Sequence, residues 1–325
     1  MHRTALLAAA LVIGAEAGAP APGLAADYPA KPVKMVISYP PGGGMDVLAR
    51  IVAAPLGERL KQPVIVDNRP GASGMIGADF VAKAAPDGYT LILAPADTHS
   101  IAPHVYTNIR YDARRDFEPV AFVGNFPIAL VVNPGIQVSS VGDFIRMVRE
   151  KPGRMTFASW GIGSSSHVAM EVLMQGAGVK MLHVPYTGAA PAVTAVIGGQ
   201  VDSMMVTLPT AEPHHLASKV RILGVTPTQR PPGAPTYSKE GMPSDVVLWG
   251  GVLAPAKTPR DFVALLNREL KAMMDDPQVR AAIAKAGLEP ATSVGTPAEF
   301  KTFLEQQYDA WGRTIRAANI SMEFK

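Results

Sequence analysis

Short apolar runs alternate with helical patterns along the first part of the chain. The pattern predicts three buried strands, at Val33–Ser38, Val64–Asp67 and Thr90–Ala94, and two helices between them, at Met45–Leu60 and Met75–Ala85. Strands that are separated by helices favour parallel sheets with right-handed crossovers. The fold class predicted for this part is therefore α/β.

The pattern starts again in the middle of the chain. Val120–Asn133 reads as an extended tract that contains Pro127 and stops at Pro134. A second α/β series follows. Its predicted helices and strands are Ser140–Arg149 (helix), Met155–Ser159 (strand), Ser164–Met174 (helix), Met181–Val184 (strand), Ala190–Ile197 (helix), Val201–Val206 (strand) and Val220–Val225 (strand).

The last part of the chain reads as one strand followed by helices. Trp249–Ala254 is a continuous apolar run. Thr258-Pro259 and Thr296-Pro297 each predict a helix with threonine as the cap and proline at the first position. Asp261 and Glu299 then fall at the third position of a capping box.

These series predict two lobes and a short segment ahead of them. Residues 27–127 and 248–325 would form lobe 1, and residues 128–247 would form lobe 2. The chain would cross between the lobes near Phe126–Ile128 and Val246–Gly250.

The N-terminal segment has the pattern of a secretory signal peptide. His2 and Arg3 precede an apolar run over Ala5–Ala15, and small residues follow as far as Asp27. The run is shorter than the roughly 20 residues that span a bilayer. We expect residues 1–26 to be removed, with cleavage near residues 25–26, and the protein to be periplasmic; an uncleaved anchor is the alternative.

Composition narrows the class of partner. The chain has no cysteine, which excludes a lipid-modified cysteine anchor and a disulfide framework. Its formal net charge is only +3, and the one adjacent basic pair, Arg114-Arg115, is surrounded by acidic residues. A nucleic-acid-binding surface needs a basic stripe, so no nucleic acid partner is expected.

Four loops follow predicted strands and lead into predicted helices or polar segments. They are Tyr39–Asp46, Pro95–His99, Trp160–His167 and Pro185–Ala190. In open α/β sheets this edge binds ligands, because helix N-termini present free N–H groups and partial positive charge to an anion. Each loop alone also fits an ordinary helix start, with Asp46 or Ser164 as the cap. Their occurrence in both halves favours one shared anion site.

Other kinds of site are less well supported. The sequence lacks a P-loop, a complete dinucleotide fingerprint and a nucleophile elbow. His167 and Glu171 lie four residues apart, and Glu212, His214 and His215 lie close together, but neither set has the spacing of a zinc motif. We interpret His167 as a residue that braces its loop, and we expect no metal and no cofactor.

Three long segments resemble a known family. They are "YPAKPVKMVISYPPGGGMDVLAR", "QPVIVDNRPGASGMIGADFVAKAAPDGYTLILA" and "HVPYTGAAPAVTAVIGGQVD". With "WGGVLAPAKTP" and the helical C-terminus they extend the resemblance from about Tyr28 to Ile320. The family is that of the Bug proteins, the periplasmic solute-binding proteins of tripartite tricarboxylate transporters.

The resemblance implies a type II periplasmic-binding-protein fold, in which two α/β lobes enclose a ligand cleft. It also implies a small organic carboxylate as ligand, held by loop backbone and hydroxyl groups, and a large and a small membrane subunit as partners of a monomer. The residues expected at the ligand are Tyr39, Pro41, Gly42, Gly43, Gly44, Met45, Asp46, Ala96, Asp97, Thr98, Trp160, Gly163, Ser164, Ser165, Ser166, His167, Tyr186, Thr187, Gly188 and Thr207.

Two departures from the family pattern concern the ligand. Val206 stands where many members carry an aspartate, which makes an amino-acid ligand less expected. Trp160 stands where members usually carry a small residue. Its indole would either pack against its own lobe or form a flat wall for an aromatic or longer apolar carboxylate.

The function expected from these features is capture of an organic anion without catalysis. Two alternatives stay open. The same scaffold could serve as a ligand-dependent sensor subunit. It could also be an enzyme that uses His167, or His99 with Asp97, as acid and base.

Overall fold

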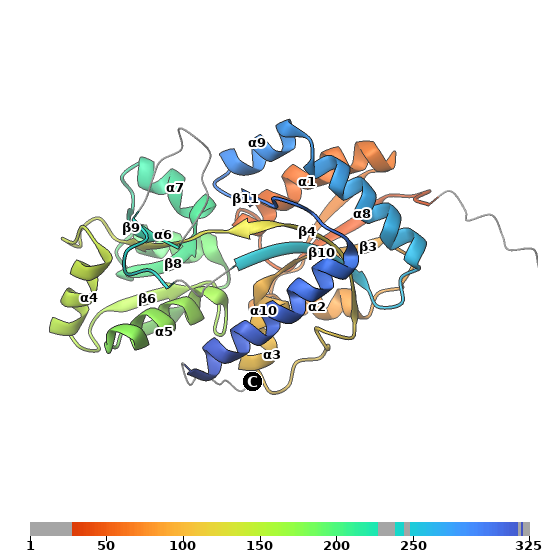
Figure 1. Cartoon of the computed structure of the whole chain (residues 1–325). Coiled ribbons are helices and arrows are strands. Elements are labelled where there is room, and N and C mark those ends of the chain that lie inside the picture. Colours follow the sequence, from red (N-terminus) through yellow and green to blue (C-terminus); the bar gives the residue numbers. More distant parts are fainter. Residues whose placement is uncertain (1–27, 227–237, 244–247, 318–319, 321–325) are drawn as a thin grey trace, which may run out of the picture.

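The computed structural model describes residues 28–226, 238–243, 248–317 and 320. Two sheets with their helices form two lobes that lie side by side (Figure 1). The expected two-lobe α/β fold is therefore confirmed. The predicted signal peptide, residues 1–26, lies outside the described residues, as do residues 246 and 247 of the second predicted crossing.

The first lobe is built on a six-stranded sheet with the order β11-β4-β10-β3-β1-β2. Its strands are β1 (Val33–Ile37), β2 (Val64–Asn68), β3 (Thr90–Pro95), β4 (Phe117–Phe126), β10 (Leu248–Pro255) and β11 (Glu289–Pro290). Its helices are α1 (Gly44–Leu60), α2 (Met75–Ala82), α3 (Ala102–Val105), α8 (Arg260–Met274), α9 (Pro277–Lys285) and α10 (Pro297–Ala317), with short helical turns η1 (Ala72–Gly74) and η2 (Asp97–Ile101).

The second lobe is built on a five-stranded sheet with the order β7-β6-β8-β5-β9. Its strands are β5 (Ile128–Val132), β6 (Thr156–Ser159), β7 (Leu182–Pro185), β8 (Ser203–Thr207) and β9 (Arg221–Val225). Its helices are α4 (Val141–Glu150), α5 (Ser165–Ala177), α6 (Ala189–Ile197) and α7 (Leu208–Leu216).

The parallel pairing predicted for the first three strands is confirmed, but both sheets also contain antiparallel strands. β1 pairs in parallel with β2 and β3, but β10 is antiparallel to both β3 and β4. In the second sheet β5 is antiparallel to both β8 and β9. Two consecutive strands can pair in parallel only if a crossover connection joins them. β5 follows β4 directly, so it enters the second sheet without a helix before it.

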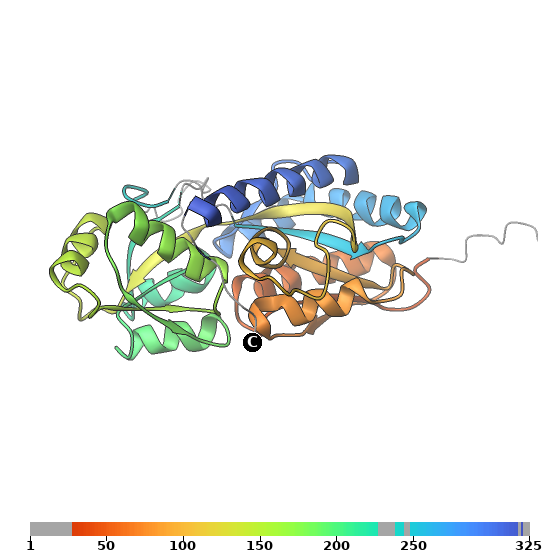
Figure 2. The same cartoon turned by 90° about the horizontal axis from the view of Figure 1, so that it is seen from below.

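One proline separates the two sheets along the chain. β4 ends at Phe126 in the first sheet, Pro127 follows, and β5 begins at Ile128 in the second. The tract crosses the molecule between the lobes (Figure 2). Leu208 N donates to Pro127 O at 2.7 Å, which ties the start of α7 to this point. The single extended tract that the sequence predicts is thus two strands of different sheets.

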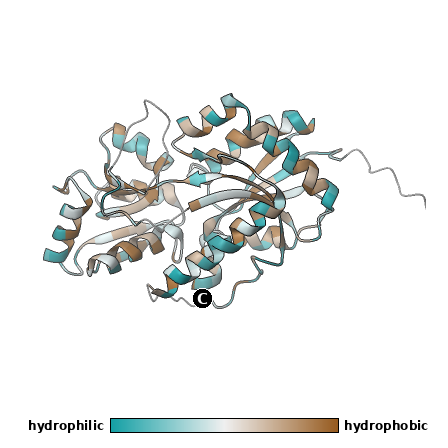
Figure 3. Cartoon of the chain, in the orientation of Figure 1, coloured by the Kyte–Doolittle hydropathy of each residue, from teal (hydrophilic) through white to brown (hydrophobic). Residues whose placement is uncertain are grey.

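The central strands are buried on both faces. All eight residues of β10 and all five residues of β5 and of β8 are buried. Helices cover these sheets with their apolar sides inward and their polar sides outward (Figure 3). Strands buried on both sides read as continuous apolar runs, which is why the sequence marks them clearly. Among the described residues, no helix has the length and apolarity needed to cross a bilayer.

Helix starts test the capping predictions directly. The Thr296 hydroxyl accepts from Glu299 N at 3.2 Å, and the Glu299 carboxylate accepts from Thr296 N at 2.7 Å, so this capping box is confirmed. The prediction for Thr258 is wrong. Its hydroxyl donates to Pro255 O at 2.7 Å, and α8 begins after Pro259 with no side-chain cap. The tight turn after β10 takes the hydroxyl that the helix would have used.

Candidate ligand-binding cleft

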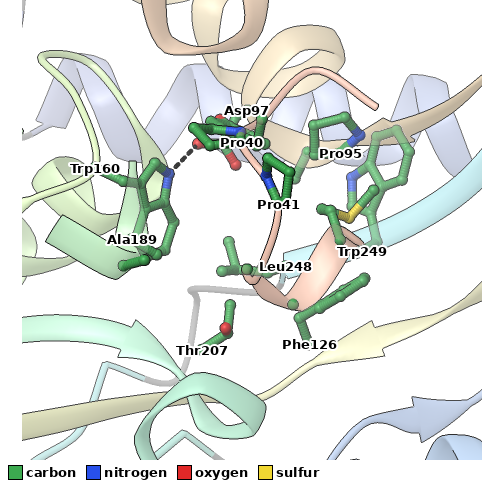
Figure 4. Close-up of a pocket in the computed structure, with 16 residues that line it drawn as sticks. Pro40, Pro41, Pro95, Asp97, Phe126, Trp160, Ala189, Thr207, Leu248 and Trp249 are labelled. Carbon is green, nitrogen blue, oxygen red and sulfur yellow. Dashed lines mark hydrogen bonds between the residues drawn. The ribbon is translucent and has the colours of Figure 1, made fainter. Parts of the chain in front are cut away.

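A cavity lies between the two lobes, at the ends of strands from both sheets (Figure 4). The space between its walls, including the part that is open to solvent, is about 570 Å³. Its lining residues are Tyr39, Pro40, Pro41, Gly43, Gly44, Met45, Pro95, Ala96, Asp97, Phe126, Trp160, Ala189, Ala190, Thr207, Leu248 and Trp249.

The N-terminus of α1 opens into this cavity. Gly43 is the N-cap and provides no side-chain hydrogen bond to the helix. The N–H groups of the first turn, which begins with Gly44 and Met45, have no acceptor within the helix and carry the positive end of its dipole. Gly44 also allows close approach of the lobes, since a Cβ there would lie 3.0 Å from Thr207 Oγ1.

Asp46 follows in the same turn but points away from the cavity. Its carboxylate accepts from Gly42 N at 3.1 Å, from Asn68 Nδ2 at 3.0 Å and from Arg50. Burial acts to raise the pKa of Asp46, but the hydrogen bonds from Arg50 and Gly42 N outweigh it, and the pKa is lowered. Asp46 thus holds the glycine loop through Gly42 N, and its carboxylate does not bond the N–H groups of the first turn that face the cavity.

The N-terminus of α5 is occupied by a carboxylate from the opposite lobe. Asp97 Oδ1 accepts from Ser165 N at 2.8 Å and from Trp160 Nε1 at 3.1 Å. Asp97 Oδ2 accepts from Ser165 Oγ at 2.9 Å. The Asp97 side chain belongs to the turn after β3, so these three bonds join the lobes across the cleft. Figure 4 shows the bond from Trp160.

Tyr39 lies beside the same carboxylate. Burial, followed by the negative charge of Asp97 and a hydrogen bond to it, raises the pKa of the Tyr39 phenol well above its usual value. Its hydroxyl also lies 3.2 Å from Ser73 O, to which it can donate. Tyr39 therefore stays protonated and acts as a neutral donor at this end of the cavity.

Trp160 separates the inner cavity from a second, outer one. Together with Tyr39 and Pro40 it lines both spaces, and only 7% of its surface is exposed. Both interpretations of Trp160 therefore hold in part, because the ring packs within the protein and also forms a wall of the cleft. The outer cavity is further lined by Pro70, Gly71, Ala72, Ser73, Gly74, Tyr106, Gly161, Ile162, Pro185, Tyr186 and Thr187.

Contacts at the outer cavity also join the lobes. Ser73 Oγ donates to Ile162 O at 2.6 Å, and the Tyr106 hydroxyl donates to the same oxygen. A Cβ at Gly188 would lie 3.0 Å from Pro40, so the second-lobe loop needs glycine where it meets the first. The structure is thus a closed arrangement of the two lobes.

The structure brings only some of the predicted ligand residues to the cavities. Of these, Tyr39, Pro41, Gly43, Gly44, Met45, Ala96, Asp97, Trp160 and Thr207 line the inner cavity, and Tyr186 and Thr187 line the outer one together with Tyr39 and Trp160. The others line neither: Gly42, Asp46, Thr98, Gly163, Ser164, Ser165, Ser166, His167 and Gly188.

Several of these other side chains have partners inside the protein. Ser164 caps α5 by accepting from His167 N, and Ser166 Oγ donates to Met205 O. Thr98 is fully buried, with its Oγ1 2.8 Å from His99 Nδ1. In this arrangement the serine hydroxyls of the second loop are used to hold the loop or to hold Asp97.

The interpretation of His167 as a loop brace agrees with its contacts. Its Nδ1 accepts from Gly163 N at 3.2 Å, and its ring stacks on His183 at a centroid distance of 3.9 Å. Burial lowers the pKa of His183 to about 3, with a smaller contribution from His167. In the part of the chain that the structure describes, no group of three His, Asp or Glu residues could hold a metal ion.

The residues that an acid–base enzyme would need are not assembled as a pair. His99 is buried among Tyr111, Phe117 and Trp249, and burial lowers its pKa to about 3. The hydrogen bonds of the Asp97 carboxylate run to Trp160 and Ser165 instead of to a histidine.

Sequence reasoning missed much of the apolar wall. Seven residues line the inner cavity without having been expected at the ligand: Pro40, Pro95, Ala189 and Ala190, which lie in the predicted loops, and Phe126, Leu248 and Trp249, which lie outside them. Phe126 and Leu248 lie where the chain was predicted to cross between lobes, so the crossings themselves were the available signal. Trp249 Nε1 is buried and has no hydrogen-bond partner among the described residues.

Val206 does not face the cavity. Its side chain is fully buried in β8, and the next residue, Thr207, lines the cavity. The Thr207 hydroxyl lies 3.1 Å from that of Thr210. The hydroxyl of Thr207, rather than a side chain at position 206, is therefore the group of β8 that a ligand would meet.

Known proteins resemble this chain along most of its length. Residues 48–320 match the family described as "Tripartite tricarboxylate transporter family receptor". BugT of Bordetella pertussis is 34% identical over 328 residues, which cover 99% of this chain and 100% of BugT.

Solved structures of binding proteins have the same fold. A protein of R. palustris solved with adipate is 31% identical, with a TM-score of 0.83 over 91% of this chain and 100% of that one. MatC from Rhodopseudomonas palustris, solved with bound malate, is 28% identical, with a TM-score of 0.81 over 89% and 100% of the two chains. The family and these neighbours are solute-binding proteins, and the resemblance found in the sequence is confirmed. The chain belongs to the tripartite tricarboxylate transporter receptor family, that of the Bug proteins.

Proposed function

We propose that this protein captures a small organic carboxylate between its two lobes and delivers it to a membrane transporter of one large and one small subunit. The observation that carries the proposal is the uncapped N-terminus of α1, which opens into a cavity with mainly apolar walls. Free N–H groups and the helix dipole suit a carboxylate, and the apolar walls suit the rest of a small organic molecule.

The ligand carboxylate would bind the first-turn N–H groups of α1, beginning with Gly44 and Met45. The Thr207 hydroxyl would add a hydrogen bond from the second lobe. Pro41, Phe126 and Trp160 would contact the ligand body. Adipate and malate, the ligands of the two solved neighbours, are small organic carboxylates.

We further propose lobe 1 as residues 27–127 and 248–325 and lobe 2 as residues 128–247, with the cleft opening by a hinge motion near Pro127. Membership of β4 in one sheet and β5 in the other supports this division. The protein would be exported as a monomer after cleavage near residues 25–26. Mass spectrometry of the N-terminus of protein isolated from the periplasm tests the export step.

A thermal-shift screen of residues 27–325 tests ligand binding. The panel contains aliphatic mono-, di- and tricarboxylates, aromatic acids and amino acids, with inorganic phosphate as the control. A ligand at 100 times its Kd adds about 2.7 kcal/mol to the free energy of unfolding, which raises Tm by several degrees. A shift with a carboxylate and a one-to-one calorimetric titration support the proposal. A shift with phosphate alone, or turnover of the bound carboxylate, overturns it.

A further inference from the structure

Asp97 occupies the site that a ligand carboxylate would take at α5. Its two oxygens receive the Ser165 N–H, the Ser165 hydroxyl and the Trp160 indole N–H at 2.8, 2.9 and 3.1 Å. A helix N–H, a hydroxyl and an aromatic N–H are also the donors that bind carboxylate ligands in proteins. The second-lobe half of the cleft is therefore already filled by an anion of the protein itself.

The side chain of Asp97 is held in place by its surroundings. The side chain is 5% exposed, and its carboxylate crosses from the turn after β3 to a helix of the other lobe. The Tyr39 hydroxyl, which donates to Ser73 O at 3.2 Å, lies beside it. With donors on both oxygens, the carboxylate does not need a ligand cation to complete its hydrogen bonds.

The remainder of the cavity cannot neutralise a second negative charge. The described residues that line it include no lysine and no arginine, and Asp97 is the only one that carries a formal charge. Most of the others are apolar, among them Phe126, Leu248 and Trp249. A ligand with two carboxylates would place its second charge against these walls or beside Asp97, and like charges in a poorly solvated site repel strongly.

We propose that Asp97 is a resident anion that determines specificity: it replaces the second carboxylate of a ligand, so that the cleft selects an organic acid with one carboxylate and an apolar body. This inference rests on the proposed function, because it assumes that a carboxylate binds at α1. It separates this chain from the two solved neighbours, whose ligands, adipate and malate, each carry two carboxylates.

Matched ligands test the inference by calorimetric titration of residues 27–325. Hexanoate and adipate form one pair, and benzoate and terephthalate form the other; each pair differs by one carboxylate. We expect each monocarboxylate that binds to do so at least tenfold more tightly than its dicarboxylate partner. 6-Aminohexanoate, which carries a cation at the far end, should gain nothing over hexanoate.

Variants at Asp97 test the cause of this selectivity. In Asp97→Asn and Asp97→Ser the ratio of the adipate Kd to the hexanoate Kd should fall at least tenfold. Asp275→Asn, which removes the same charge from an exposed position, should leave that ratio unchanged. Circular dichroism and Tm show whether each variant is folded, and the ligand pairs on the unaltered protein test the selectivity itself even if both variants unfold.

The outcomes separate this inference from the function on which it rests. Adipate or terephthalate that binds the unaltered protein as tightly as its partner would overturn the role of Asp97 and leave carboxylate capture standing. Tighter binding of 6-aminohexanoate than of hexanoate would show that Asp97 pairs with a ligand cation, which also overturns it. If no carboxylate in either pair or in the wider panel binds, the proposed function fails and the inference fails with it.

Discussion

The helices α1 and α5 begin at matching places in the two lobes, yet they present different surfaces to the cleft. Both follow a glycine-containing loop at the end of a parallel strand. The first turn of α1 faces the cavity without a side-chain cap, whereas the first turn of α5 is capped by Ser164 and bonded to Asp97. Two loops of the same kind can therefore have different roles, and the difference comes from a residue outside both of them.

The largest expected effect comes from blocking the uncapped N-terminus of α1. Gly44→Ala places a Cβ 3.0 Å from Thr207 Oγ1 and 3.3 Å from Phe126, which prevents the close approach of the lobes. We expect the hexanoate or benzoate Kd to rise about 100-fold, or about 2.7 kcal/mol, in calorimetric titration. Gly176→Ala, in the exposed part of α5 with nothing within 4 Å, is the control. Binding by Gly44→Ala within threefold of the original protein would show that α1 is not the ligand end.

The N-terminus of α5, which Asp97 occupies, should contribute mainly to stability. Ser165→Ala removes the hydroxyl that donates to Asp97 Oδ2 and leaves a buried carboxylate short of a partner. Since a hydrogen bond to a buried charge contributes about 2 kcal/mol, the free energy of unfolding should fall by that amount in urea titration. Ser139→Ala removes an exposed serine–aspartate bond of 2.8 Å and should leave the free energy of unfolding nearly unchanged. Equal losses of unfolding free energy in the two variants would show that the bond from Ser165 to Asp97 contributes no more than an exposed one.

Acid should weaken the packing behind the α5 loop. The pKa of His183, lowered to about 3 chiefly by burial, lies below the usual unfolded value of about 6.5. The unfolded chain therefore binds the proton more readily, and the stability from neutral His183 is present above about pH 6.5 and is lost as the pH falls toward 3. We expect a loss of about 1 kcal/mol per pH unit between pH 6 and 4 from this residue.

The His183→Gln variant isolates that contribution. Its unfolding free energy, measured at several pH values, should fall less steeply than that of the original protein. His214→Gln, at a site where the pKa is lowered less, should keep most of the slope. Because His183 stacks on His167 behind the α5 loop, its protonation would weaken the packing of the second lobe there. Parallel curves for His183→Gln and the unaltered protein would contradict this assignment.

The smallest effect should come from the indole that bonds Asp97. Trp160→Phe keeps an aromatic wall but removes the donor 3.1 Å from Asp97 Oδ1. That oxygen still accepts from Ser165 N, so we expect a loss of only about 1 kcal/mol in unfolding free energy. In the double variant with Ser165→Ala the losses should not add, since both act on one carboxylate. Strict additivity would mean that the two bonds are independent.

The parts of the fold that local pattern encodes could be predicted from the sequence. β10 and β5 are continuous apolar runs because they are buried on both faces, and Thr296 with Glu299 forms the capping box that its spacing indicates. The cap predicted at Thr258 did not form, because its hydroxyl donates to a competing acceptor three residues earlier, Pro255 O. The antiparallel direction of β10 was not predicted, because its pairing with β3 joins residues about 160 positions apart, which local periodicity does not report.

The candidate site was predictable only in outline. The glycine loop of α1 could be found, since free helix N–H groups depend on nearby residues. The bond from Asp97 to Ser165 spans 68 positions and two lobes, so no pattern around either residue indicates it. Trp249 reads as part of a buried strand, and only the packing of β10 beside the cavity makes it a lining residue.

The three bonds of Asp97 have a consequence for the time that a ligand stays bound. They join the lobes without involving the ligand, and all three would have to break whenever the cleft opens by the proposed hinge motion. The energy barrier to opening would thus contain a part that is the same for every ligand. This part should lengthen the residence time of every acid by the same factor, so differences in affinity between acids should still lie mainly in how fast each one leaves.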